Sequence, residues 1–232
     1  MQRPPDRFDR RLLIGVAAVV LLLLGACDGG GEAPATPVAT GGQTGAQDES
    51  ADATAEEIAT GFLEAFGAFD VDRATGYLAA DAEISALLIG TASVEGAEEE
   101  LRLNLSMLEA QGYEQQLGSC EETSTSVSGT GVRCPFEFHL FGSDDIGRGP
   151  YSGSYFDVTV LDGEVVRGSV TYEIEEFSPQ MWEPFAEWVS TTYPDDAAAM
   201  YTDGTYTGVL ISEQSIQLWG QHVPEYVEEV ES

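Results

Sequence analysis

The sequence predicts an α+β protein in which helices come first, a run of antiparallel strands follows, and a helical extension ends the chain. Three patterns lead to this prediction. Apolar residues recur at helical spacing up to residue 112, alternate with a period of two between residues 113 and 175, and return to helical spacing after Glu175. This order is typical of proteins that pack helices on one side of an antiparallel sheet.

The first predicted helix has a defined start and one apolar face. Thr54 and Glu57 match a capping box, in which each side chain bonds to the backbone of the other residue. The residues expected on the buried face are Ile58, Phe62, Phe66 and Phe69. Asp70 then provides the N-cap of a short second helix over residues 71–81.

A third helix is expected after a short apolar segment. Residues 83–90 are a candidate strand, Ser93 would open the helix, and Gly112 would end it. The apolar stripe of this helix comprises Val94, Ala97, Leu101, Leu105 and Leu108. The helix therefore brings a second apolar face to the core.

Strands are expected over residues 113–120 and 132–141, and a β-hairpin over residues 154–174. The hairpin turn is Asp162-Gly163, because this pair accepts the positive φ angles of a two-residue turn. With this turn, Asp157 would lie opposite Gly168 and share a face with Tyr155 and Tyr172.

Two cysteines flank a polar loop between the expected strand ends. Cys120 and Cys134 enclose a segment rich in Ser, Thr and Gly, and neither has a metal-ligand pattern beside it. In an oxidising compartment such a pair forms a disulfide. We therefore expect a Cys120–Cys134 bridge and no metal site.

The N-terminus has the pattern of an export signal. Four arginines precede an apolar run from Leu12 to Leu24, which is shorter than the roughly 20 residues that span a bilayer. Leu24-Gly25-Ala26-Cys27 resembles the bacterial lipobox, whose cysteine receives a diacylglyceryl group and a further acyl chain such as palmitate. The resemblance implies a signal peptide over residues 1–26, lipidation of Cys27, and an extracytoplasmic protein anchored to the cell membrane. Residues 27–52, rich in Gly and Pro, would be a disordered tether.

The charge of the chain excludes one class of partner. Nine Lys+Arg, all of them arginine, oppose 41 Asp+Glu, for a net charge of −32. Such a surface repels the phosphates of nucleic acid, so no nucleic-acid partner is expected. The cysteine-linked lipid would supply the membrane contact that this acidic surface itself disfavours.

Residues 59–84 carry a family resemblance, through an aromatic helix followed by the short motif Asp70-x-x-Arg73-Ala74. This segment and the order of elements resemble the nuclear transport factor 2-like superfamily. The resemblance implies a cone-shaped domain over residues 53–176, in which a curved antiparallel sheet wraps over helices and encloses a pocket. The helical extension over residues 177–232 is similar to those of secreted actinobacterial members. Some members are ketosteroid isomerases or polyketide cyclases, and many only bind ligands.

Asp157 is the one candidate catalytic residue, with Tyr155 and Tyr172 as candidate ligand-binding residues. Among apolar neighbours a carboxylate has a raised pKa and can act as an acid or base. The alternative is that Asp157 lies on a solvated face of the sheet, since the sequence does not say which face is inside. Glu137 and His139 share a strand face and form either a proton-transferring dyad or a solvated pair. His222 shows no identifiable partner.

Two functions are consistent with these residues. The first is a non-catalytic domain that binds a small apolar ligand or another envelope protein and needs no cofactor. The sequence does not determine its oligomeric state. The second is an exported isomerase, dehydratase or cyclase that uses a pocket carboxylate. Sparse histidine favours the first. The aromatic residues expected to dock the extension on the domain are Trp182, Phe185, Trp188 and Trp219.

Overall fold

The computed structural model describes residues 53–87, 90–91, 96–125, 127–202, 206 and 208–232. The predicted signal peptide, lipidation site Cys27 and tether lie outside these residues. The helices and strands up to the hairpin are α1 (Ala55–Gly67), α2 (Val71–Thr75), β1 (Leu78–Ala86), β2 (Gly90–Thr91), α3 (Ala97–Ala110), β3 (Glu114–Leu117), β4 (Glu121–Thr123), β5 (Thr130–His139), β6 (Tyr151–Leu161) and β7 (Glu164–Thr171). The C-terminal elements are a π-helical turn η1 (Ser178–Trp182), α4 (Glu183–Thr192), α5 (Pro194–Met200), β8 (Val209–Leu210) and α6 (Glu213–Glu231).

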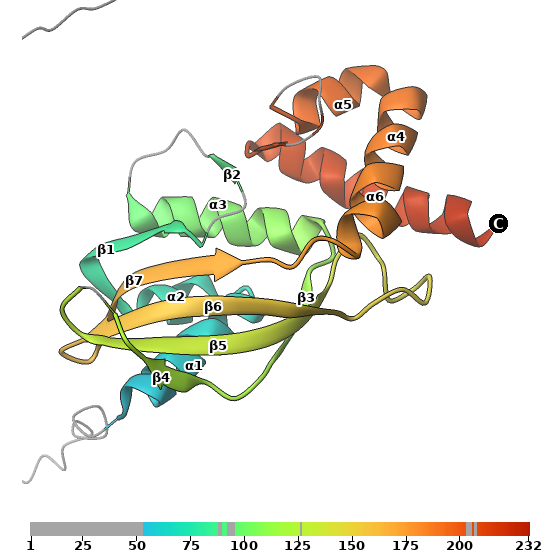
Figure 1. Ribbon diagram of the computed structural model, residues 1–232. Helices are drawn as coiled ribbons and strands as arrows, with labels where there is room; N and C mark the ends of the chain where they lie inside the picture. The colour runs from blue at the N-terminus through green and yellow to red at the C-terminus, as the bar shows by residue number, and fades with distance from the viewer. Residues whose placement is uncertain (1–52, 88–89, 92–95, 126, 203–205, 207) are drawn as a thin grey trace, which may run out of the picture. The chain divides into compact units, whose positions relative to one another are not determined.

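The predicted fold class is confirmed: helices pack on a curved sheet, and a helical extension follows. The sheet has the strand order β1-β7-β6-β5-β3, and β4 adds to β5. Its strands pair antiparallel except for β1, which runs parallel to β7. Figure 1 shows α1 to α3 against one side of this sheet and α4 to α6 grouped near the C-terminal end of β7.

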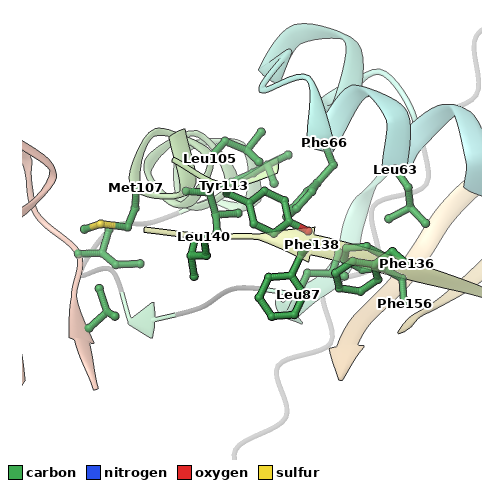
Figure 2. Packing of buried hydrophobic residues seen from close by; sticks show 14 of the residues in the cluster. Leu63, Phe66, Leu87, Leu105, Met107, Tyr113, Phe136, Phe138, Leu140 and Phe156 are labelled. Carbon is green, nitrogen blue, oxygen red and sulfur yellow. The ribbon is translucent and has the colours of Figure 1, made fainter. Parts of the chain in front are cut away.

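The core lies between the sheet and the first helices. Phe66 of α1 packs edge-on against Phe156 of β6 at a centroid separation of 5.8 Å, and Phe156 stacks on Phe136 of β5 at 4.3 Å. Figure 2 shows these side chains beside Leu105 of α3 and Phe138 of β5. Ile58, Phe62 and Phe66 of the predicted face of α1 are buried, as are Leu101, Leu105 and Leu108 of the predicted face of α3. Phe69 lies beyond the end of α1 and is only partly buried.

The capping and the disulfide follow the sequence. Thr54 and Glu57 make both hydrogen bonds of the capping box, at 3.2 Å and 2.8 Å. A disulfide joins Cys120 to Cys134 of β5, as predicted. The bridge ties the segment that precedes β4 to the middle of the sheet.

The second predicted helix is too long. It ends at Thr75, and Leu78 already begins β1, whose residues 83–86 lie within the candidate strand. The reason is tertiary: the Val165 amide of β7 donates to the Tyr77 carbonyl at 2.8 Å, and the following residues pair with β7. Sheet pairing thus overrides the local helical spacing.

The third helix and the flanking strands also differ at their ends. Helix α3 begins at Ala97 after Gly96, and Ser93 and Val94 lie outside the described residues. Strand β3 covers only Glu114–Leu117, while β5 begins two residues earlier than expected and ends at His139. The sequence did not predict β4.

The hairpin register is correct only near the turn. Leu161 pairs with Glu164 across Asp162-Gly163 as predicted, but the register shifts between Thr159 and Val160. Beyond this irregularity Asp157 faces Ser169 rather than Gly168. A shift of one residue exchanges the two faces of one strand relative to its partner, so Asp157 no longer shares a face with Tyr172.

The extension forms an aromatic cluster against the domain. Trp219 of α6 is fully buried and stacks on Phe185 of α4 and Phe141 after β5, with centroid separations of 5.0 Å and 5.1 Å. Residues 194–204 have the acidic, Pro- and Gly-containing sequence of a solvated turn, yet Pro194–Met200 forms the helix α5. Pro194 occupies the first position of this helix and Asp195 and Asp196 its first turn, which favours helix initiation.

Candidate functional site

A cavity of about 830 Å³ lies between the sheet, α3 and the C-terminal extension. Its volume is in the range of small-molecule sites. Residues from three regions line it: Ala86, Leu108, Gln111, Phe138, Leu140, Val170, Tyr172, Ile174, Phe177, Ser178, Trp182, Glu183, Ala186, Glu187, Ser190, Tyr206 and Val209. We call this cavity the sheet–extension pocket.

One wall of the pocket is apolar and belongs to the sheet. Phe138 of β5 and Val170 of β7 contribute side chains from the same face, and Tyr172 follows β7 directly. The Phe138 and Tyr172 rings meet edge-on, with centroids 5.3 Å apart. Strand pairing through β6 fixes these residues, so this wall is rigid.

The opposite wall is one face of α4. Glu183, Ala186, Glu187 and Ser190 follow one another at spacings of three, one and three residues, which places them on a single helical stripe. Phe185 and Val189 occupy another stripe and are fully buried. Helix α4 therefore packs its apolar residues into the extension and presents a polar, acidic stripe to the pocket.

Two polar side chains of the pocket have buried atoms without a hydrogen-bond partner among the described residues. They are the Nε2 atom of Gln111, whose residue is 1% exposed, and the hydroxyl of Tyr172. Burial raises the pKa of Tyr172 above its ordinary value, and the nearby Tyr113 hydroxyl opposes this rise. A buried donor without a partner costs free energy.

Asp157 and Tyr155 do not reach the pocket. The Arg133 side chain donates to both Asp157 oxygens, from Nε at 2.8 Å and from Nη2 at 2.7 Å, and its guanidinium lies 4.0 Å from the centre of the Tyr155 ring. Both side chains of the ion pair are more than one-third exposed. The structure thus separates the three predicted site residues, because the register shift places only Tyr172 in the pocket.

The second predicted pair is also separated. His139 Nδ1 is 3.0 Å from Ser143 Oγ, and its Nε2 is 3.9 Å from an Asp144 oxygen. Among the described residues no hydrogen bond joins His139 to Glu137, although both lie on the strand face away from Phe138. His139 therefore belongs to the turn after β5.

His222, for which the sequence offered no partner, lies at the centre of the extension. It is fully buried, with Nε2 3.0 Å from an Asp196 oxygen of α5 and Nδ1 2.9 Å from a Glu225 oxygen of α6. Its ring stacks on Tyr193 at 4.3 Å. The imidazole therefore links α5 to α6 through its two ring nitrogens.

Within the described ranges, no group of three or more His, Cys, Asp or Glu side chains is arranged to hold a metal ion. Within the same ranges, no helix combines the length and the apolar composition that crossing a membrane requires. Among the described residues that line the pocket, those with polar side-chain groups are Gln111, Tyr172, Ser178, Trp182, Glu183, Glu187, Ser190 and Tyr206.

No protein-family model and no curated protein sequence matches this chain. Its structure is similar to that of a putative polyketide cyclase from Pseudomonas putida, with 14% identity over 55% of this chain and 98% of the other, and a TM-score of 0.39. An epoxide hydrolase-like protein from Mycobacterium tuberculosis shows 14% identity over 59% of this chain and 96% of its own, with a TM-score of 0.38. An NTF2-like protein of unknown function from Cytophaga hutchinsonii shows 11% identity over 52% of this chain and 91% of its own, with a TM-score of 0.35.

Proposed function

We propose that this chain is an exported, lipid-anchored envelope protein whose domain binds a small apolar ligand without transforming it. The observation that carries the proposal is the sheet–extension pocket. Its volume and its apolar sheet wall, with a few polar side chains beside it, are the features of a small-molecule site.

The anchoring part of the proposal rests on the sequence. The basic residues, the short apolar run and Leu24-Gly25-Ala26-Cys27 occur in the order of a lipoprotein signal. Two or more acyl chains on one cysteine hold a protein firmly at a bilayer. The disulfide between Cys120 and Cys134 supports export, because such bonds persist in oxidising compartments.

The alternative function, an isomerase, dehydratase or cyclase, depended on a pocket carboxylate at Asp157. That carboxylate is paired with Arg133 on the other side of the sheet. The carboxylates that do line the pocket, Glu183 and Glu187, are exposed rather than enclosed by apolar side chains. Binding is therefore the function that the geometry supports better.

Mass spectrometry of the full chain purified from membranes of its own host tests the proposal. Under native conditions the mass should exceed the mass measured under denaturing conditions, because only a noncovalent ligand is lost on denaturation. The organic extract should contain an apolar compound, unchanged after incubation with the protein. Equal masses, together with no uptake of added dodecanol, would contradict ligand binding. Conversion of the extracted compound would instead favour the enzyme.

A further inference from the structure

We infer that the sheet–extension pocket selects a cationic amphiphile, a molecule with an apolar body and a basic nitrogen, over neutral and anionic molecules of the same size. This inference rests on the proposed function, because it names the chemical class of ligand for the same pocket. Three observations carry it: the charges that line the pocket, the position of those charges on α4, and the apolar wall opposite them.

The described residues that line the pocket include two carboxylates and no Lys, Arg or His. An anionic ligand such as a fatty-acid carboxylate would meet Glu183 and Glu187 without any compensating cation. The net charge of −32 adds long-range repulsion of the same sign. Anionic amphiphiles are therefore the class that the pocket disfavours most.

The two carboxylates act together because they lie one turn apart on α4. Glu183 and Glu187 are four residues apart, so their side chains are neighbours on the stripe that faces the pocket. One Glu183 oxygen accepts a hydrogen bond from Ser178 Oγ at 3.2 Å. Among the described residues Glu187 makes no side-chain hydrogen bond or ion pair, so its carboxylate is available to a ligand.

The rest of the lining suits the apolar body of such a ligand. Phe138 and Val170 form the sheet wall of the pocket. Trp182 and Tyr206, which belong to the C-terminal extension, line the pocket as well. The indole nitrogen of Trp182 donates to the Tyr206 carbonyl at 2.9 Å, which holds these two residues together.

The buried Nε2 of Gln111 is an observation independent of the acidic stripe. It is an unpaired donor in a residue that is 1% exposed and lines the same pocket. Because Nε2 itself is buried, a ligand acceptor would reach it only after the Gln111 amide rotates toward the cavity. Gln111, the C-cap residue of α3, is therefore a polar side chain of the pocket in addition to the charged stripe on α4.

Binding of three probes with the same alkyl chain tests the inference: dodecylammonium, dodecanol and dodecanoate. The full chain carrying Cys27→Ser, which cannot be acylated, is titrated with each probe by isothermal calorimetry below micelle formation. We expect dodecylammonium to bind about tenfold more tightly than dodecanol at low salt, and dodecanoate to bind most weakly. The preference should decrease as salt rises, because the two glutamates are exposed.

The variant Glu183→Gln/Glu187→Gln should lose the preference for ammonium and keep its affinity for dodecanol. The matched control is Glu229→Gln/Glu231→Gln, which removes the same charge from exposed positions of α6 outside the pocket and should keep the preference. Equal affinities for the three probes, or a preference that survives in the pocket variant, would overturn the inference while dodecanol binding sustained the proposed function. Failure of all three probes to bind would overturn both.

Discussion

The two walls of the pocket are built in different ways. The sheet wall contains Phe138 and Val170, which strand pairing holds within the domain, and Tyr172, which follows β7 directly. Helix α4 is held by side-chain packing, through the stack of Phe185 on Trp219 and the contact of Trp188 with His222. The sheet therefore supplies a rigid apolar surface, while the extension closes the pocket and adds charge. Substitutions in the two regions should therefore separate loss of stability from loss of binding.

The largest effect is expected from Trp219→Ala, which removes the centre of the aromatic cluster. A buried tryptophan replaced by alanine costs about 3–5 kcal/mol of unfolding free energy, because it leaves a cavity. Dodecanol affinity should fall as well, since α4 loses its support. Urea denaturation measures the stability. The control Leu210→Ala, at a residue that is 37% exposed, should change it by less than about 1 kcal/mol. A similarly small change for Trp219→Ala would show that the extension is not packed as described.

On the sheet side, Cys120→Ala/Cys134→Ala should cost about 3 kcal/mol of unfolding free energy, because the reduced chain regains the entropy of a loop that spans 14 residues. The pocket lies elsewhere, so dodecanol affinity under folding conditions should not change. Thermal denaturation with and without reductant provides the comparison, and reductant should not affect the variant. A loss of affinity in the folded variant would show that the two walls are coupled.

His222→Gln should destabilise the extension by about 2 kcal/mol, because glutamine carries both of its donors on one nitrogen, whereas Glu225 and Asp196 lie beside different ring nitrogens of His222. Near-ultraviolet circular dichroism, which reports the surrounding aromatic residues, follows the loss. His139→Gln is the matched control, since His139 is only half-buried and contacts a turn. If both variants were equally stable, the buried contacts of His222 would contribute nothing.

A pH dependence follows from Glu225. The hydrogen bond from His222 lowers the pKa of the Glu225 carboxyl below the ordinary value of 4.5. A group whose pKa is lowered on folding contributes stability above its unfolded pKa, and this contribution is lost as the pH falls through the folded value. The melting temperature should therefore fall below about pH 4.5, and it should fall less steeply in His222→Gln. Identical acid profiles in the two proteins would contradict this.

The smallest effect is expected from Asp157→Asn. Its ion pair with Arg133 is more than one-third exposed, and such pairs contribute about 1 kcal/mol or less. Dodecanol affinity should be unchanged, because the side chain lies outside the pocket. A large loss of dodecanol affinity in a variant with an unchanged melting temperature would show that Asp157 belongs to the binding site.

Local patterns in the sequence predicted several parts of this structure correctly. The Thr54 capping box, the Asp162-Gly163 turn and the Cys120–Cys134 bridge each depend on residues close in sequence. The register irregularity at Thr159 has no local signal, and it alone moves Asp157 away from Tyr172. The errors in the predicted elements arise where pairing with a distant strand overrides local spacing.

The site was harder to predict because its residues come from distant segments. Tyr172 was among the predicted site residues and lines the pocket, whereas Gln111, the C-cap residue of α3, was not predicted. The stripe of Glu183 and Glu187 was visible as helical spacing beside the aromatic stripe of α4, yet the sequence does not say that it faces Phe138. His222 meets Asp196 across 26 residues, a contact that requires the folded extension.

The central claim is that a ligand binds between the sheet and α4, and a cavity-filling pair of variants tests it most directly. Val170→Phe adds volume inside the pocket, whereas Val166→Phe adds the same volume on the same strand at a half-buried position outside it. Dodecanol binding is measured by calorimetry on both variants after their melting temperatures are compared. Val170→Phe should weaken dodecanol binding at least tenfold, and Val166→Phe should leave it unchanged. Unchanged binding in a folded Val170→Phe protein would contradict it.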